Sequence, residues 1–204
     1  EVVPNGVDTD FFAPDAEAAV AFRDRHDLPE EGPLVGYTGR HGYEKRLSDL
    51  LRAAEGLDVT VVLGGDGPAR ADLEALAEEV DVDVRFLGFL DRADLPSFYA
   101  SLDVFAFPSP VETQGLVALE ANACGTPVAG VDAGALSETI QAGETGYKAR
   151  AGDTSAFRDV IERTLADRED LREDCLDRRA EIGVDHAVDL LEAVYADVLD
   201  RPRT

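Results

Sequence analysis

Short apolar segments alternate with amphipathic segments along most of the chain. Five apolar segments rich in β-branched or aromatic residues cover residues 34–38, 59–63, 84–87, 104–107 and 128–131. Uninterrupted apolar runs of this length, bounded by Gly, Pro or polar residues, are typical of strands buried in a parallel sheet. Apolar residues at helical spacing predict helices at residues 16–26, 44–55, 69–80, 94–101, 115–124 and 135–142. This alternation predicts an α/β fold built on a Rossmann-like, doubly wound parallel sheet.

The chain is expected to end in a C-terminal helical extension. After a short extended piece at residues 145–150, helical segments cover residues 154–166, 169–182 and 187–199. The last helix carries apolar residues around much of its circumference, namely Ala187, Leu190, Leu191, Val194, Tyr195 and Val198. Such a helix requires a second apolar surface, either on this domain or on a partner. We therefore predict a linker with a short helix (1–33), the sheet domain (34–183) and a C-terminal helix (184–204).

The chain is strongly acidic. Its 204 residues include 43 Asp and Glu against 19 Lys and Arg, which gives a net charge of −24. Because this charge repels nucleic acid and anionic lipid, we expect no nucleic-acid partner. The acidic residues are spread over every segment, as on the solvated surface of halophilic cytoplasmic proteins, and a specific cationic partner is the alternative.

Other features of the composition favour a cytoplasmic protein that is not a whole translation product. Cys124 and Cys175 lie far apart without a CxxC motif, which suits free thiols in a reducing compartment. The chain contains no run of about 18 apolar residues and no leader, so neither a membrane span nor secretion is expected. It begins at Glu1 and enters directly on VVPNGVD, so we expect a fragment or a processed form.

The segment from residue 108 to residue 127 carries the most specific pattern. Its sequence, PSPVETQGLVALEANACGTP, lies between two predicted strands. The helix within it, at residues 115–124, places Leu116, Leu119 and Ala123 at the spacing of one helix face. Because the helix follows a strand, its first amides should lie at the carboxyl edge of the sheet, where ligands bind in α/β proteins. The N–H groups of Gly115, Leu116 and Val117 are therefore candidate donors to an anion.

Two carboxylates flank the start of this helix. Glu112 lies in the preceding loop and Glu120 lies eight residues later, on the second turn. Neither can contact a phosphate without repulsion, but both can accept hydrogen bonds from hydroxyl groups on either side of it. A carboxylate that accepts from hydroxyl groups, amides that donate to an anion, and a second such carboxylate follow one another. This order fits a nucleotide-diphosphate sugar. The alternative is that Glu112 is an exposed loop acid and Glu120 a solvated helix residue.

The loop after the first predicted strand, GYTGRHGYEKR at residues 36–46, supplies cations. Arg40 and Lys45 lie at a strand exit in a chain with only two lysines, which makes them candidates for holding a phosphate. They could equally be surface residues that offset nearby acids. His41 lies in the same loop and is interpreted as a bystander in preference to a catalyst.

Two further loops are less specific. GGDGPAR at residues 64–70 is a weak match to a dinucleotide-binding fingerprint, because the third glycine is missing. Gly88, Phe89 and Leu90 follow the third predicted strand and could offer polar backbone groups and a ring to a flat base. An ordinary apolar loop plug is an equal alternative for these three residues.

Taken together, these motifs resemble a known family. PVETQGLVALEANACGTPVAG is similar to the E-x7-E signature of retaining glycosyltransferases of the GT-B fold, family 4 (group 1 type). VPNGVDTDFF resembles the linker that opens their C-terminal, donor-binding domain, and GRHGYEKR resembles their GR-x3-EKG loop. The similarity extends from about residue 2 to residue 160, and the ordered set of motifs is more specific than any one of them.

The resemblance implies a role for each matching residue. Arg40 and Lys45 would hold the diphosphate, together with the backbone amides of residues 115–117. Glu120 would bind the ribose hydroxyls. Glu112 would bind the transferred sugar and lie near the reacting carbon, so that Glu112, Arg40 and Lys45 are the expected catalytic residues.

Residues 88–90 would line the base. Two positions depart from the family pattern. Arg46 replaces the usual glycine after the lysine, and Gln114, in the donor-binding loop, occupies a place often held by an aromatic residue. The ETQG variant is similar to that of lipid-linked glucosyltransferases.

The resemblance implies the donor-binding half of a metal-independent retaining hexosyltransferase. Its donor would be UDP- or GDP-linked and its acceptor a lipid, a glycan or a small molecule, with no cofactor. An N-terminal acceptor domain would be missing, so we expect the fragment to be inactive alone and its last helix to return to that domain. Peripheral membrane association of the full-length protein is left open. The alternatives are a nucleotide-sugar epimerase of related architecture and a non-catalytic Rossmann module.

Overall fold

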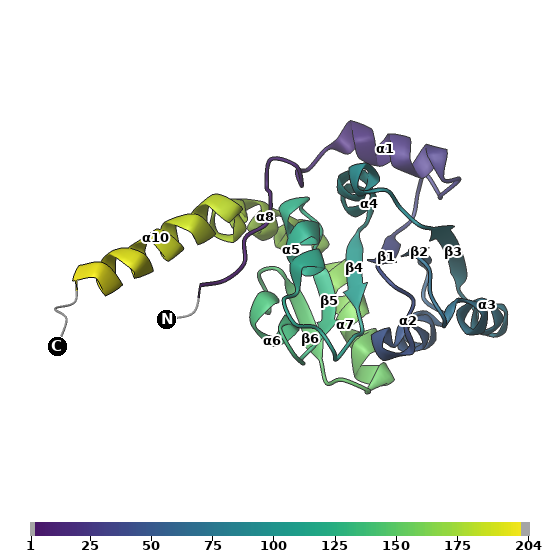
Figure 1. Ribbon diagram of the computed structural model, residues 1–204. Coiled ribbons are helices and arrows are strands. Elements are labelled where there is room, and N and C mark those ends of the chain that lie inside the picture. The colour runs from purple at the N-terminus through teal and green to yellow at the C-terminus, as the bar shows by residue number, and fades with distance from the viewer. Residues whose placement is uncertain (1–2, 201–204) are drawn as a thin grey trace.

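A sheet of six parallel strands forms the centre of the fold (Figure 1). The computed structural model describes residues 3–200, with the side chain of residue 200 outside the description. The strands are β1 (Leu34–Thr38), β2 (Thr60–Gly64), β3 (Asp83–Gly88), β4 (Val104–Phe107), β5 (Val128–Val131) and β6 (Gly146–Ala149). Their order in the sheet is β3-β2-β1-β4-β5-β6. This confirms the predicted fold class, and the sixth strand is the segment that was expected only as an extended piece.

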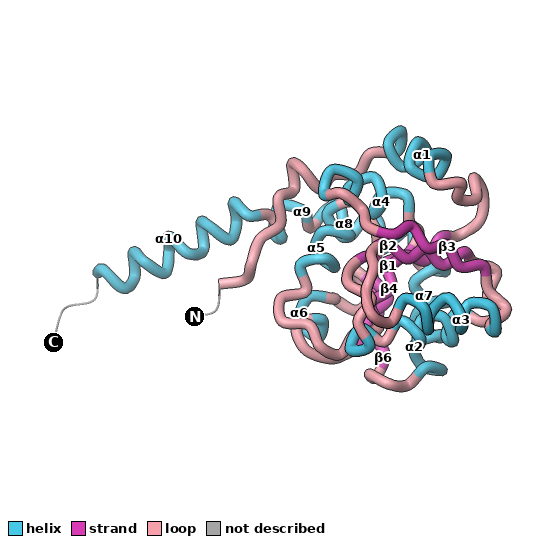
Figure 2. The backbone as a smooth tube through the Cα atoms, turned by 45° about the vertical axis from the view of Figure 1, so that its right-hand side comes forward, coloured by secondary structure: helices cyan, strands magenta, loops and turns pink. Residues whose placement is uncertain are grey.

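Helices cover both faces of the sheet (Figures 1 and 2). The helices are α1 (Ala16–Arg25), α2 (Leu47–Ala54), α3 (Arg70–Glu79), α4 (Leu95–Ser101), α5 (Leu116–Ala123), α6 (Leu136–Thr139), α7 (Thr154–Ala166), α8 (Arg168–Asp177), α9 (Arg179–Ile182) and α10 (Val184–Asp200). The contacts group α2, α3 and α7 on one side and α1, α4, α5, α6 and α8 on the other. Because of this cover, every residue of β1, β2, β4 and β5 is buried.

The aromatic side chains of β1 and β4 form the middle of the core. The rings of Tyr37 and Phe105 are stacked with their centroids 6.2 Å apart, and Phe107 meets Tyr37 edge-on at 6.1 Å. Strand β3, at one edge of the sheet, is only partly buried. The buried centre therefore coincides with the strand pair β1 and β4, which are far apart in sequence but adjacent in the sheet.

The helix expected at residues 44–55 begins later than predicted. Residues 43–45 form a 3-10 turn instead, and Arg46 follows in the left-handed region with φ of 53°. That conformation ends the turn and lets α2 start at Leu47 in a new direction. Apolar spacing cannot reveal such a break, because Leu47, Leu50 and Leu51 are buried in either case.

Two other helix predictions were wrong in part. The expected helix at residues 169–182 is divided into α8 and α9, and the helix at 135–142 is shortened to α6. In α5, Leu116 and Leu119 are only partly buried, while Ala118, Ala121 and Asn122 face the interior. Small side chains allow α5 to lie close to the sheet, where the Asn122 amide donates to the Thr126 carbonyl oxygen at 3.0 Å.

The final helix, α10, projects away from the rest of the molecule (Figures 1 and 2). Its apolar side chains Val188, Leu191, Tyr195 and Val198 are exposed. The start of α10 is held by the N-terminal segment, because Val7 N–H donates to the Ile182 carbonyl oxygen and Val184 N–H to that of Val7, both at 2.9 Å. The segments around residues 7 and 183 thus lie side by side. Residues 1–2 and 201–204 of the predicted linker and terminal helix lie outside the described residues.

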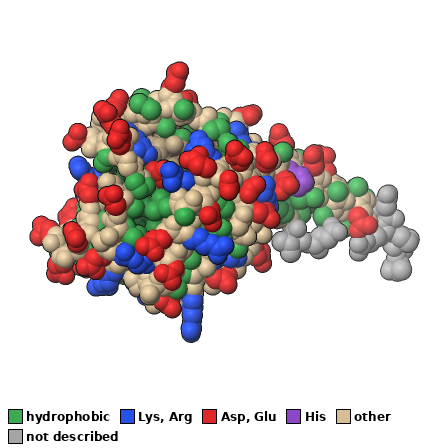
Figure 3. All heavy atoms as spheres, turned by 180° about the vertical axis from the view of Figure 1, so that it is seen from behind, with side chains coloured by type: hydrophobic (Ala, Val, Ile, Leu, Met, Phe, Trp, Pro, Cys, Tyr) green, Lys and Arg blue, Asp and Glu red, His purple; other side chains and the backbone are tan. Residues whose placement is uncertain are grey.

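Acidic side chains are scattered over the face of the molecule shown in Figure 3, with fewer basic ones between them. The basic residues are commonly paired with acids on neighbouring turns, as in the Arg70–Glu74 pair at 2.6 Å. Within residues 3–200, no helix is both long enough and apolar enough to cross a membrane.

Candidate functional site

A cavity of about 610 Å³ opens at the carboxyl edge of the sheet. The chain leaves β1 toward β2 on one side, whereas β4 pairs with β1 on the other side. Such a reversal of strand order separates the loops and leaves a crevice where α/β proteins bind ligands. The loops after β1, β2 and β3 line the cavity together with residues of α4 and α5.

The cavity brings together five of the residues that were predicted from the sequence. They are Arg40, Phe89, Leu90, Val117 and Glu120. Leu90 is buried, whereas Phe89 is 82% exposed and its ring is free to cover a flat group. Gly88 precedes them with φ of 71°, and this turn carries the chain out of β3. These residues come from three separate segments, the loops after β1 and β3 and helix α5, so only the fold makes them neighbours.

Glu120 is held at the cavity wall by a tyrosine. The Tyr99 hydroxyl donates a hydrogen bond to Glu120 Oε2 at 2.8 Å, and Tyr99 is completely buried. Burial raises the pKa of Glu120, while the Tyr99 hydrogen bond and the positive charge of Arg92 act in the opposite direction. The carboxylate is thus partly desolvated and has one oxygen fixed.

The cations of the β1 loop are paired with acids. Arg40 Nη1 lies 2.9 Å from Glu44 Oε1, and Lys45 Nζ lies 3.3 Å from Glu112 Oε2. Arg40 is mostly exposed, so it can turn toward an anion at little cost. Lys45 and Glu112 are mostly buried side chains, with 21% and 18% of their surfaces exposed. The structure therefore joins two residues for which the resemblance implies separate ligand groups.

The loop that carries Glu112 is anchored on its far side. Ala135 N–H, just before α6, donates to the Glu112 carbonyl oxygen at 3.0 Å. Glu112 Oε1 in turn accepts from the Thr113 amide at 3.1 Å. Both the backbone and the side chain of Glu112 are therefore fixed beside Lys45.

The N-terminus of α5 follows directly on the loop that carries Glu112. The amides of Ala118 and Leu119 both donate to the Gly115 carbonyl oxygen, at 3.0 and 3.3 Å. The amides of residues 115–117 thus precede the hydrogen-bonded part of the helix and can donate to an anion. Gly115 has φ of 68°, a conformation that a glycine adopts without strain.

Gln114 lies apart from the other predicted donor residues. It lines a second hollow of about 710 Å³ between α5, α6, the N-terminal segment and the start of α10. It therefore lines a different hollow from the one that Arg40 and Glu120 line.

His41, which was expected to be a bystander and not a catalyst, ties the β1 loop to the β2 loop. Its side chain is fully buried, and Nε2 lies 3.2 Å from the Gly64 carbonyl oxygen. Because a carbonyl oxygen only accepts, Nε2 carries the hydrogen, and burial lowers the pKa of His41. The backbone adds to this tie, since His41 N–H donates to the Asp66 carbonyl oxygen at 2.8 Å.

The glycine-rich segment 64–70 packs against this same loop. A side chain at Gly65, which has φ of 107°, would overlap the Gly39 carbonyl oxygen. A Cβ at Gly67 would lie 2.6 Å from the His41 carbonyl oxygen. These glycines are therefore required for contact between two loops, which explains them without a dinucleotide.

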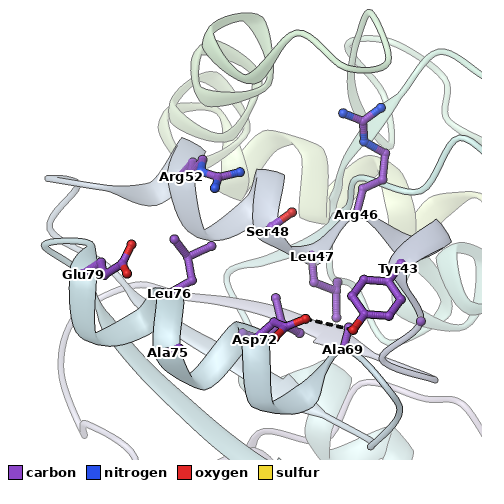
Figure 4. A pocket seen from close by; sticks show the side chains of 12 residues that line it. Tyr43, Arg46, Leu47, Ser48, Arg52, Ala69, Asp72, Ala75, Leu76 and Glu79 are labelled. Carbon is purple, nitrogen blue, oxygen red and sulfur yellow. Dashed lines mark hydrogen bonds between the residues drawn. The ribbon is translucent and has the colours of Figure 1, made fainter.

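Tyr43, the first residue of the 3-10 turn, connects the turn to helix α3 (Figure 4). Its hydroxyl donates to Asp72 Oδ2 of α3 at 2.8 Å, across a hollow of about 320 Å³ between α2 and α3. In Figure 4 the Tyr43 ring and Asp72 point toward one another, while Arg46 points away from the hollow. The turn that carries Lys45 is thus attached to a neighbouring helix.

Several cavity residues were not predicted from the sequence. Phe12, Asp66, Arg92 and Tyr99 all line the cavity. Arg92 lies over the Phe11 ring, 4.7 Å from its centroid, which keeps its charge near Glu120. Phe12 and Asp66 lie within the quoted segments VPNGVDTDFF and GGDGPAR but were not singled out, whereas Arg92 and Tyr99 belong to no motif. Across residues 3–200, no group of three or more His, Cys, Asp or Glu side chains is arranged to hold a metal ion.

A family model described as "Glycosyl transferases group 1" matches residues 20–180. The chain is also 35% identical to 2-deoxystreptamine glucosyltransferase from Streptomyces kanamyceticus, over 100% of this chain and 56% of that protein. The chain spans about half the length of the curated relatives it matches.

Solved structures show the same fold. Sucrose-phosphate synthase from Thermosynechococcus elongatus superposes with a TM-score of 0.85 at 30% identity, covering 98% of this chain and 52% of that one. The structure of a C-terminal domain of a glycosyl transferase group 1 family protein (LpcC) from Francisella tularensis gives a TM-score of 0.73 at 28% identity. That match covers 84% of this chain and 95% of the other.

Proposed function

Since this chain belongs to the group 1 glycosyl transferase family, we propose that it binds a nucleotide-diphosphate sugar at the carboxyl edge of its sheet. It is the donor-binding half of a retaining hexosyltransferase. The donor is a substrate, linked to UDP or GDP, and the reaction uses neither a cofactor nor a metal.

The observation that carries this proposal is the composition of one cavity wall. Arg40, Val117 of the first turn of α5 and Glu120 line the same cavity of about 610 Å³. A cation and free amides suit a diphosphate, and a fixed carboxylate suits the ribose hydroxyls. Glu120 and the exposed Phe89 ring line the same cavity. A base attached to the ribose would therefore lie against the Phe89 ring.

The chemistry expected of these residues is electrostatic. As the bond between sugar and diphosphate breaks, negative charge grows on the leaving diphosphate. Arg40, Lys45 and the amides of residues 115–117 stabilise that charge, once the two cations have turned from Glu44 and Glu112 toward the diphosphate. Glu112 accepts hydrogen bonds from the transferred sugar and keeps its reacting carbon beside the diphosphate.

We propose further that transfer requires a second domain that binds the acceptor. The chain spans about half the length of its curated relatives, and the Francisella structure that it resembles is described as a C-terminal domain. In this arrangement residues 1–33 connect the two domains, and residues 184–204 return to the acceptor domain. The full-length protein acts in the cytoplasm, a reducing compartment that suits the buried thiols of Cys124 and Cys175.

Isothermal titration calorimetry with UDP and GDP tests donor binding. We expect the chain to bind at least one of them and Glu120→Ala to weaken that binding about tenfold or more, because hydrogen bonds to a charged group are lost. Glu78→Ala, which removes an exposed carboxylate of α3, is the matched control and should leave the titration unchanged. Failure of the wild-type chain to bind either nucleotide, or equal titrations for Glu120→Ala and wild type, would refute the proposal.

A further inference from the structure

We propose that Tyr99 is a positioning residue for the donor: its hydroxyl holds Glu120 Oε2 so that the other carboxylate oxygen faces the ribose hydroxyls. This inference rests on the proposed function and adds to it a residue that belongs to none of the matched motifs. It concerns the orientation of the carboxylate, and it assigns no contact between Tyr99 and the ribose.

Tyr99 is suited to this role because its own position is fixed. Its side chain is fully buried, and its ring packs against those of Phe12, Phe98 and Phe105 with centroids 5.5 to 6.0 Å apart. Its backbone is fixed as well, since the Thr126 hydroxyl donates to the Tyr99 carbonyl oxygen at 2.7 Å. The hydroxyl of Tyr99 can therefore occupy essentially one place, at the cavity wall.

Glu120, in contrast, needs an external restraint. It lies in the middle of α5, and a glutamate side chain has three rotatable bonds whose freedom must be lost when it binds a ligand. Within residues 3–200, its hydrogen-bond partner is the Tyr99 hydroxyl, which contacts Oε2. An ionised carboxylate has about four acceptor positions, so Oε1 keeps its full capacity to accept from neighbouring hydroxyl groups.

The charges around the pair favour an ionised acceptor. Arg92 lines the same cavity, and its positive charge stabilises the charged form of Glu120. A phenol that donates to a carboxylate does the same, whereas burial works against it. Tyr99 thus provides both the orientation and part of the ionisation of the carboxylate before the donor arrives, which lowers the cost of binding.

Calorimetry with ribose-modified nucleotides separates positioning from a merely structural role. Wild type and Tyr99→Phe are titrated with UDP, GDP and their 2′,3′-dideoxy analogues. We expect wild type to prefer the ribose form, and Tyr99→Phe to lose about tenfold in affinity for that form while its affinity for the dideoxy form stays unchanged. A structural defect would weaken both forms equally, and this equal loss would overturn the inference.

Tyr147→Phe is the matched control, because the Tyr147 hydroxyl also donates to a carboxylate, Asp167 Oδ2 at 2.7 Å, on another part of the fold. It should keep the full preference for ribose. If Tyr99→Phe does not fold, Glu120→Asp leaves Tyr99 intact and withdraws the carboxylate by one methylene group; full ribose preference in that variant would overturn the inference. Absence of nucleotide binding by wild type would refute the proposed function itself, whereas binding with unchanged preference in Tyr99→Phe would refute only the role of Tyr99.

Discussion

The ammonium group of Lys45 lies 3.3 Å from the carboxylate of Glu112, although the two residues are 67 positions apart. They belong to the loops after β1 and β4, the two strands at which the strand order reverses. If Lys45 holds the diphosphate and Glu112 the sugar, each must give up part of this contact when the donor binds. The pair therefore keeps both residues in place while opposing the binding of a nucleotide that lacks a sugar.

We expect Glu112→Gln to bind UDP or GDP about two- to fivefold more tightly than wild type, because Lys45 is released from a mostly buried ion pair. In the full-length enzyme the same change should abolish sugar transfer. Calorimetry and a transfer assay measure the two effects. Glu44→Gln frees Arg40 from a more exposed pair and should change nucleotide affinity less. Weaker nucleotide binding by Glu112→Gln would contradict this account of the pair.

Acid should destabilise the protein partly through His41. Burial lowers its pKa in the folded protein, whereas the unfolded chain has the ordinary value of about 6.5. The unfolded state therefore binds more protons below that value, so the contribution of His41 to stability is complete above pH of about 6.5 and is lost as the pH falls. His26 shifts in the same direction, so the test must compare variants.

Urea unfolding at about pH 7.5 and about pH 5.5 measures this contribution. We expect His41→Gln to be less stable than wild type at the higher pH, because the hydrogen bond to Gly64 is weakened, but to lose less stability on acidification. His186→Gln, on the exposed side of α10, should behave as wild type at both values. Identical pH dependence in His41→Gln and wild type would show that His41 is not the group responsible.

The sequence predicted the helices and strands well, but it predicted the candidate site only as separate residues. The predicted bounds of β4, 104–107, and of α7, 154–166, equal the observed ones, because a buried strand and a capped amphipathic helix have strong local patterns. The start of α2 could not be predicted, since the left-handed conformation of Arg46 depends on the 3-10 turn before it.

Contacts between distant segments were beyond sequence reasoning for a different reason. Glu120 was identified from its spacing to Glu112, but nothing local indicates that its partner is Tyr99, which is 21 residues earlier. In the same way, His41 has the sequence surroundings of a loop residue, and only the packing of the β2 loop buries it. Motif spacing reveals residues of one segment, whereas the neighbours that tune them come from other helices and loops.

The exposed face of α10 allows a test of the domain proposal. Leu191 is 40% exposed, so Leu191→Ala should change the free energy of unfolding of this chain by no more than about 0.5 kcal/mol. Leu171→Ala, in the buried face of α8, should cost about 2–5 kcal/mol. In the full-length protein Leu191→Ala should become destabilising. A large loss in the isolated chain, measured as a dilute monomer, would mean that α10 packs on this domain.

The acidic surface should make stability depend on salt. With 43 acidic and 19 basic residues, the folded chain repels itself, and salt screens that repulsion. We expect the melting temperature to rise as KCl is raised from about 0.1 M to about 1 M, because the screening length falls from about 10 Å to about 3 Å over this range. A variant with the exposed residues Glu17, Glu78 and Glu173 changed to Gln should be more stable than wild type at low salt. Its melting temperature should also rise less when KCl is added. A melting temperature that falls with salt would contradict this account of the acidic surface.

The bridge between Val7 and Gly183 has a consequence for protein engineering. Everything that lines the cavity lies between these two positions, and the chain enters and leaves that region through two segments joined by an isolated β-bridge. A gene segment cut at codons 7 and 183 would therefore encode a unit whose two ends meet. Transplanting that unit between family members would require only two neighbouring junctions to be matched.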